Sequence, residues 1–186
     1  MITKMFPELE EVFDAPQDEH QTYFFPICSI DLSSMNPNWK ETIHFILFND
    51  DPYHETRFEF FNAVCSDNSI GFHLHNGKLA LAADMNFMQV SNKWEKWLEK
   101  TKKGYLTAKE QYHNPDNKID YPAKIQLGGY PRWVQEDATP VDKDGQPLPF
   151  VGAFYSANFV FDYCAKDIYV FYNPKEKTVV QVYQIT

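Results

Sequence analysis

The sequence predicts a single α+β domain built mainly from antiparallel sheet, with one clear amphipathic helix and long loops. Three observations indicate this fold. Aromatic residues make up 17% of the 186-residue chain, and apolar runs rich in strand-forming residues recur along it. An Asn-Gly pair at 76–77 separates two short alternating runs, which is typical of a tight hairpin. Apolar residues at convincing helical spacing occur at about 91–103.

The first half of the chain contains a lead-in segment and most of the predicted strands. Residues 1–21 are acidic and interrupted by proline, which is typical of a short helix or an extended lead-in. Strands are predicted at 23–32, 42–48 and 57–64, followed by the hairpin at 72–81. The run at 42–48 is almost continuously apolar, which indicates a strand buried on both faces.

The predicted helix can begin at Ser91 or Asn92, since either residue can serve as an N-cap. Its apolar positions lie opposite a face of lysines and glutamates. Gly104 is expected to end it, because glycine is favoured just beyond a helix C-terminus. Residues 105–123 are then predicted to be a polar loop, with a short helix at 107–112 as an alternative.

The C-terminal part of the chain is predicted to be a loop followed by a closing hairpin. Residues 136–149 contain three prolines and an Asp-Gly pair, which favours a long, turn-rich loop. Strand-like runs at 167–172 and 178–183 flank the hairpin turn. The sequence contains a weak internal repeat, in which residues 25–49 are similar to residues 148–173. Each stretch has a proline beside apolar residues, followed by a predicted strand. Two such units would pair in one antiparallel sheet, and chance similarity between β-rich stretches is the alternative.

The charge balance excludes some classes of partner. The formal net charge is −9 and the isoelectric point is about 5.1. Such a surface repels phosphate backbones, so nucleic-acid binding is not expected. Two interpretations stay open: the charge provides solubility, or an acidic face meets a basic protein partner.

Cysteine usage and hydropathy indicate a cytoplasmic protein. Cys28, Cys65 and Cys164 are odd in number, far apart and flanked by apolar or aromatic residues, which predicts buried free thiols in a reducing compartment. The N-terminus lacks an apolar stretch of signal-peptide length, and no apolar run reaches the length of a membrane span.

No convergent catalytic motif is visible, so we expect a non-catalytic protein without a cofactor or metal. His73 and His75 would share one face of a strand, but only Asp84 could approach them, and zinc sites need three or four ligands. Asp50 and Asp51 are predicted to form a solvated acidic turn, because neighbouring carboxylates in loops point apart. No cysteine carries the local signature of a nucleophile.

The segment 127–135 is the most distinctive in the chain. Two adjacent glycines permit positive φ angles, and the proline that follows them fixes its own backbone. Two interpretations are open. Tyr130 and Trp133 could pack into the core around the turn. Alternatively they form an aromatic lip of a binding surface, with Arg132 and Gln135 as polar contacts.

This segment also carries a family resemblance. Gly-Gly-Tyr-Pro-Arg-Trp-Val-Gln at 128–135 resembles the GG-x-P-x-W-x-Q segment of the YwqG-like family of bacterial proteins. Weaker similarities to that family lie at 26–32, 150–153, 168–171 and Gln181. Ser29 and Ala153 stand where the family usually has glutamine, and the chain is shorter than typical members. The resemblance implies an α+β fold with an antiparallel sheet, and it suggests a bacterial toxin–immunity setting.

Together these observations lead to one functional hypothesis and two rivals. The hypothesis is a non-catalytic protein-binding module of the immunity type, which neutralises a cognate basic toxin. The first rival is an enzyme or small-ligand-binding protein with a pocket near Trp133. The second is a structural or housekeeping partner, which the sequence cannot separate from an immunity protein.

Overall fold

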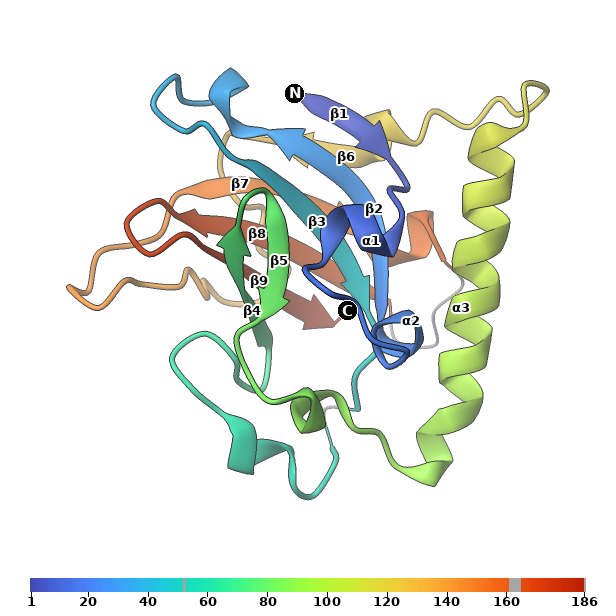
Figure 1. The fold of residues 1–186 in the computed structure, drawn as a ribbon, viewed down its shortest axis with the longest axis horizontal. Coiled ribbons are helices and arrows are strands. Elements are labelled where there is room, and N and C mark those ends of the chain that lie inside the picture. The colour runs from blue at the N-terminus through green and yellow to red at the C-terminus, as the bar shows by residue number, and fades with distance from the viewer. Residues whose placement is uncertain (52, 161–164, 186) are drawn as a thin grey trace.

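Two antiparallel sheets form the protein, so the predicted α+β class is confirmed (Figure 1). The computed structural model describes residues 1–51, 53–160 and 165–185. The three-stranded sheet has the order β1-β2-β3, with β1 at Ile2–Met5, β2 at Phe24–Asp31 and β3 at Thr42–Phe48. The six-stranded sheet has the order β5-β4-β9-β8-β7-β6, with β4 at Ser69–His75, β5 at Lys78–Leu81, β6 at Ile125–Leu127, β7 at Phe150–Tyr155, β8 at Lys166–Asn173 and β9 at Thr178–Ile185.

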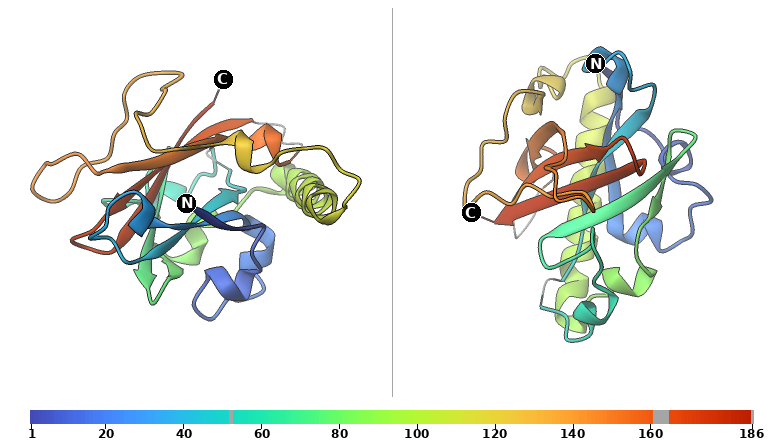
Figure 2. Two further views of the ribbon diagram at one scale, coloured as in Figure 1. Left: turned by 90° about the horizontal axis from the view of Figure 1, so that it is seen from above. Right: turned by 90° about the vertical axis from the view of Figure 1, so that its left-hand side faces the viewer.

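The helices lie around these sheets. The α-helices are α1 at Leu9–Val12, α2 at His20–Tyr23 and α3 at Asn92–His113. Short 3-10 helices are η1 at Leu32–Ser34, η2 at Arg57–Phe60, η3 at Met85–Met88, η4 at Pro122–Lys124 and η5 at Ser156–Asn158. Figure 2 shows the two sheets as separate layers, with α3 along one side of both. None of the described helices combines the length and the apolar character needed to cross a membrane.

Helix α3 is longer than predicted, and the expectation that Gly104 ends it is wrong. The helix continues to His113. Its buried face contains Thr101 before the glycine and Tyr105 and Ala108 after it. The Tyr105 hydroxyl donates a 2.9 Å hydrogen bond to the carbonyl of Pro26 in β2. This packing offsets the cost of about 1 kcal/mol that a glycine imposes inside a helix.

The predicted strand at 57–64 is also wrong, because this stretch begins with η2. Its position is set by Arg57, whose side chain points inward and is only 2% exposed. The guanidinium pairs with Asp50 and lies 4.4 Å from the ring centroid of Phe87. A buried arginine at this point is incompatible with the alternation that a half-buried strand requires.

The hairpin prediction is confirmed. β4 and β5 pair through Asn76 and Gly77, whose φ angles are +51° and +77°, as a type I′ turn requires. His73 and His75 lie exposed on one face of β4, while Leu74 between them is buried. The Gly77 carbonyl lies 2.7 Å from Nε2 of His44, so the turn also contacts β3.

The internal repeat is visible in the structure. Its two halves were expected to pair in one sheet, but they lie in different sheets. β1, β2, η1 and β3 repeat the order and pairing of β6, β7, η5 and β8. Each unit has an irregularity at the same place, at Ile27 in β2 and Val151 in β7. The two units lie in facing sheets, where Phe45 stacks on Phe154 with ring centroids 6.0 Å apart.

Gln181 joins the two sheets through the core. Its side chain is fully buried on β9, in the six-stranded sheet. The amide oxygen accepts a 2.8 Å hydrogen bond from the Ile46 N–H, and the amide nitrogen donates a 2.7 Å bond to the Ile46 carbonyl. The glutamine thus replaces a neighbouring strand at the free edge of β3, where unpaired backbone groups would be costly.

The expectation that Asp50 and Asp51 form a solvated turn is wrong, because both are buried. The Asp50 carboxylate forms ion pairs with Arg57 and Lys166, and the Tyr183 hydroxyl lies 2.8 Å from it. Burial disfavours the charged carboxylate, but the two cations outweigh it and lower the pKa of Asp50 to about 2.

Asp51 fixes the start of α3. Its Oδ2 accepts hydrogen bonds from the backbone N–H and the hydroxyl of Ser91, at 3.2 and 2.8 Å. Ser91 is the N-cap residue of α3, as the sequence predicts. The two adjacent carboxylates therefore point apart, as expected, but both point into the protein.

The prediction of buried free thiols is confirmed for the two cysteines that the structure describes. Cys28 and Cys65 are buried free thiols. Burial raises the pKa of both thiols, which makes them poor nucleophiles at neutral pH. Cys164 lies outside the described residues.

Replacing Gln181 by leucine should destabilise the protein by about 2–4 kcal/mol, because the N–H and carbonyl of Ile46 lose their partners. Urea denaturation measures the change. Gln146→Leu is the matched control, since Gln146 is exposed in the loop before β7. Equal effects of the two substitutions would contradict this role of Gln181.

The Asp50 ion pairs predict a specific acid dependence. The folded pKa lies below the ordinary value of 3.8, so the charged carboxylate stabilises the fold at neutral pH. This contribution, about 2 kcal/mol, should be lost as pH falls from about 5 to 1. Urea denaturation over this range measures it.

In Asp50→Asn the protein should be about 3–5 kcal/mol less stable at neutral pH, since two buried cations lose their counter-ion. Its stability should also fall less steeply with acid. If the free energy of unfolding of this variant fell with acid as steeply as that of the parent protein, other carboxylates would cause the pH dependence.

Candidate functional site

The Gly-Gly turn begins where β6 leaves the sheet. Gly128, directly after the last residue of β6, donates its N–H to the Val151 carbonyl of β7 at 2.8 Å. Gly128 and Gly129 have φ angles of +65° and +75°. Residues with a side chain adopt such angles only at a cost, so the sequence prediction of a glycine-dependent turn is confirmed.

Beyond the turn, the chain crosses the outer face of the six-stranded sheet. A second apolar cluster lies on this face, separate from the core between the sheets; its buried members are Leu148, Tyr169, Phe171, Val180 and Val182. Trp133 is half-buried against it, with its ring centroid 4.3 Å from that of Tyr169 and 6.0 Å from that of Phe171. Trp133 therefore packs against the sheet and keeps one part of its surface open.

Side-chain hydrogen bonds hold the backbone of this segment in place. The amide oxygen of Gln184 accepts from the N–H groups of Val134 and Gln135, at 3.0 and 2.9 Å, and its amide nitrogen donates to the Glu136 carbonyl. The Tyr169 hydroxyl donates a 2.7 Å bond to the Arg132 carbonyl. A segment without helix or strand is thus fixed at several successive residues.

Gln126 fixes the turn from its other side. Its amide nitrogen lies 3.0 Å from the Gly128 carbonyl and 2.9 Å from the Tyr130 carbonyl, and it donates to both. The Gln135 side chain in turn donates a 2.8 Å bond to the Ile185 carbonyl. Glutamines supply most of these bonds, which suits the two-sided hydrogen bonding of an amide.

The predicted binding residues differ in how they are placed. Tyr130 is 88% exposed, so core packing is excluded for it. Arg132 and Gln135 are exposed, and only Trp133 packs against the sheet. The structure places all four on one segment, with three of them open to solvent.

Two carboxylates extend this surface. Glu136 and Asp137 are exposed, and neither forms an ion pair with any described residue. Hydrogen bonds from Thr139 lower the pKa of Asp137, so it stays charged at neutral pH. Tyr130, Arg132, Gln135, Glu136 and Asp137 are called the loop surface below.

The Gly-Gly turn is flanked by two hollows. One, of about 710 Å³, is lined by residues 123–132. The other, of about 600 Å³, lies between the turn and the N-terminal sheet, with Met1, Trp39 and Phe150 in its wall. Among the residues that the structure describes, no three His, Cys, Asp or Glu side chains gather in a way that could hold a metal ion.

Sequence reasoning did not identify Gln126 and Gln184, which hold the site together. One signal was present: glutamines at 181 and 184 interrupt an otherwise apolar final strand. A buried polar side chain inside a strand needs a partner, but the sequence does not say which backbone groups supply it.

Substitution of Gly129 tests the turn. Gly129→Val should destabilise the protein by about 1–3 kcal/mol, because a β-branched residue is strained at positive φ. Gly129→Asn is the matched control and should cost less, since asparagine tolerates the left-handed region. The nearest atom to a Cβ at this position lies 3.8 Å away, so steric contact does not contribute. Equal thermal stability of both variants and the parent would contradict the required backbone angle.

Comparisons with family models, with curated proteins and with solved structures found no match to this chain. The resemblance of residues 128–135 to the YwqG-like family therefore stays a prediction from the sequence. The function has to be argued from the surface itself, because a fold alone does not specify one.

Proposed function

We propose that this protein is a non-catalytic binding module whose loop surface contacts a basic protein partner, as an immunity-type protein contacts its toxin. One observation carries the proposal: an almost fully exposed tyrosine lies on a backbone that side-chain hydrogen bonds hold fixed. Tyrosine and arginine are enriched among the residues that dominate binding energy at protein interfaces.

The fixed backbone favours binding by lowering its entropic cost. A mobile loop would have to be ordered on association, which costs free energy for each immobilised residue. Here Gln184, Gln126 and Tyr169 already order the segment in the free protein. Tyr130 and Arg132 are thus presented to a partner with little further backbone ordering.

The charge of the protein favours a basic partner. The chain carries 26 acidic and 17 basic residues, and the loop surface contains two carboxylates that form no ion pair with a described residue. Opposite charge accelerates association and disfavours partners of the wrong sign. The single arginine of the surface can still stack on an aromatic ring or pair with one carboxylate of the partner.

A second exposed surface has the same character. Tyr53 and Phe58 are 80% and 65% exposed, and the exposed carboxylates Glu55 and Glu59 lie beside them in sequence. Buried Arg57 anchors this stretch to the core. Aromatic rings next to carboxylates are suited to contact lysine or arginine side chains.

A small-ligand function is the second candidate. The hollows of about 710 and 600 Å³ at the Gly-Gly turn support it, since both fall within the usual range of ligand pockets. They lie beside the turn, whereas Trp133 covers the outer face of the sheet. A tightly bound small molecule in the purified protein would favour this candidate.

The test is capture of the native complex, followed by measurement with the purified partner. In Tyr130→Ala we expect Kd to rise by roughly thirty-fold, the effect of losing an interface residue worth about 2 kcal/mol. Leu106→Ala is the control, because Leu106 is exposed on α3 beside residues 7–9 and lies outside the loop surface. Glu136→Gln with Asp137→Asn should mainly slow association and weaken its dependence on salt.

Absence of a stoichiometric basic partner would contradict the proposal. So would a partner whose affinity is lowered equally by Tyr130→Ala and by the control substitution.

A further inference from the structure

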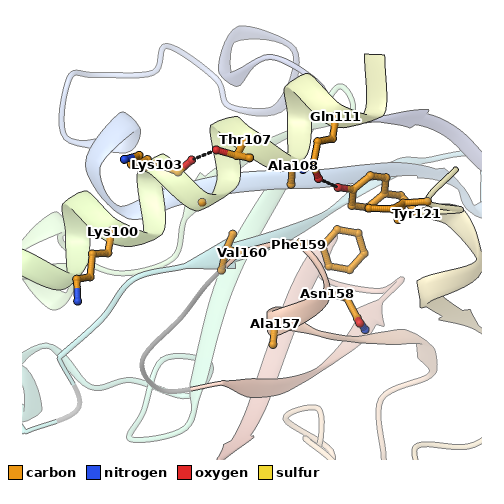
Figure 3. Close-up of a pocket in the computed structure, with 12 residues that line it drawn as sticks. Lys100, Lys103, Thr107, Ala108, Gln111, Tyr121, Ala157, Asn158, Phe159 and Val160 are labelled. Atoms are coloured by element: carbon orange, nitrogen blue, oxygen red, sulfur yellow. Dashed lines mark hydrogen bonds between the residues drawn. The ribbon is translucent and has the colours of Figure 1, made fainter. Parts of the chain in front are cut away.

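A groove of about 490 Å³ lies between α3 and η5, away from the loop surface (Figure 3). Its floor is apolar and comes from buried side chains: Ala108 of α3, Tyr121 before η4, and Phe159 and Val160 after η5. The volume lies within the range of sites that hold small molecules.

Two hydroxyl groups along the groove are already paired. The Tyr121 hydroxyl donates a 3.0 Å hydrogen bond to the amide oxygen of Gln111, and the Thr107 hydroxyl donates a 3.0 Å bond to the Lys103 carbonyl. Figure 3 shows both bonds at the edge of the groove. The floor itself therefore presents hydrocarbon and aromatic ring, and binding there depends on apolar contact.

One end of the groove is basic. Lys100 lines the groove, and Lys96 lies one helical turn before it on α3, just outside the lining. The ammonium groups of Lys96 and Lys100 lie 5.1 and 4.2 Å from the ring centroid of Trp97. Neither lysine forms an ion pair with a described carboxylate. The described residues that line the groove include Lys100 and Lys103 and no Asp or Glu.

This basic end contrasts with the rest of the chain. α3 carries six lysines and three glutamates, whereas the whole protein has a formal net charge of −9. An anion at this end of α3 would lie close to the ammonium groups beside the Trp97 ring, and an apolar group attached to it would extend toward the floor.

We propose that this groove binds a single-chain anionic amphiphile, with its hydrocarbon tail on the floor and its carboxylate or phosphate head at Lys96 and Lys100. An inorganic anion would leave the apolar floor open to water. An uncharged apolar ligand would give the ammonium groups no counter-ion, and the described residues supply none. An amphiphile satisfies both ends of the groove, and the site goes beyond the protein-binding function proposed above.

Isothermal titration with octanoate, decanoate, octylamine and octanol tests the proposal. Octanoate should bind, and decanoate should bind more tightly by up to about fourfold per added methylene. Octylamine has the same tail with the opposite charge and should not bind, and octanol should bind more weakly than octanoate. Binding of octylamine as tight as that of octanoate would overturn the proposal.

Three variants locate the ligand. Lys96→Gln and Lys100→Gln should each weaken octanoate binding by about two- to fivefold, the range of an exposed charge pair. Lys143→Gln is the control, because Lys143 is exposed in the 136–149 loop, and it should leave binding unchanged. Ala157→Trp places a large ring at the exposed rim of the groove and should abolish binding while the far-ultraviolet circular dichroism is retained.

Vesicles of phosphatidylglycerol separate a free amphiphile from a membrane lipid. The parent protein should bind octanoate without sedimenting with the vesicles. Sedimentation with the vesicles that Ala157→Trp abolishes would assign the groove to a membrane lipid and would overturn a site for free amphiphiles. Octanoate binding that survives Ala157→Trp would overturn the proposal. It would also be overturned by loss of octanoate binding that occurs equally in Lys143→Gln.

Discussion

The contact between Gln181 and Ile46 is the constraint on which the arrangement of the two sheets depends. The facing surfaces are otherwise mainly apolar, and apolar contact alone tolerates small shifts between layers. A primary amide that pairs with both the N–H and the carbonyl of one residue tolerates no such shift, because either bond would break. Together with the contact of His44 to the Gly77 carbonyl, this side chain fixes β3 relative to the six-stranded sheet, where Phe45 stacks on Phe154 of β7.

The Asp50 ion pairs act at the end of the same layer. Asp50 lies two residues after the end of β3, Lys166 begins β8 and Arg57 begins η2, so one carboxylate joins three separate segments. Buried ion pairs contribute little net stability compared with apolar packing, but leaving one partner alone is costly. The main effect of this cluster is therefore on specificity: it favours one arrangement of β3, η2 and β8 over others. It holds η2 so that Arg57 points inward while Phe58 points to solvent.

The predictions from sequence succeeded where local rules decide the structure. The Asn76-Gly77 turn and the doubly buried strand β3 follow from turn chemistry and continuous apolar character. Ser91 lies at the predicted N-cap position, but its hydroxyl bonds Asp51 and makes no capping bond to the helix. The predictions failed where distant contacts override local preference. Gly104 is a poor helix residue, but Tyr105 packs against β2 and keeps the helix intact. The stretch from Arg57 onward resembles a strand until the position of Asp50 is known.

In the candidate site, too, some features follow from local sequence and others depend on distant contacts. The glycines at 128 and 129 are identifiable from sequence because positive φ has few alternatives. The exposure of Tyr130 and the partial burial of Trp133 are not, because both depend on where Gln184 and Tyr169 hold the segment. These bonds join residues about fifty positions apart, or nearly forty for Tyr169, and no local pattern specifies them. The irregular segment is therefore ordered by regular strands beneath it. In the binding surface that we propose, this order without regular structure would present Tyr130 to a partner at low entropic cost.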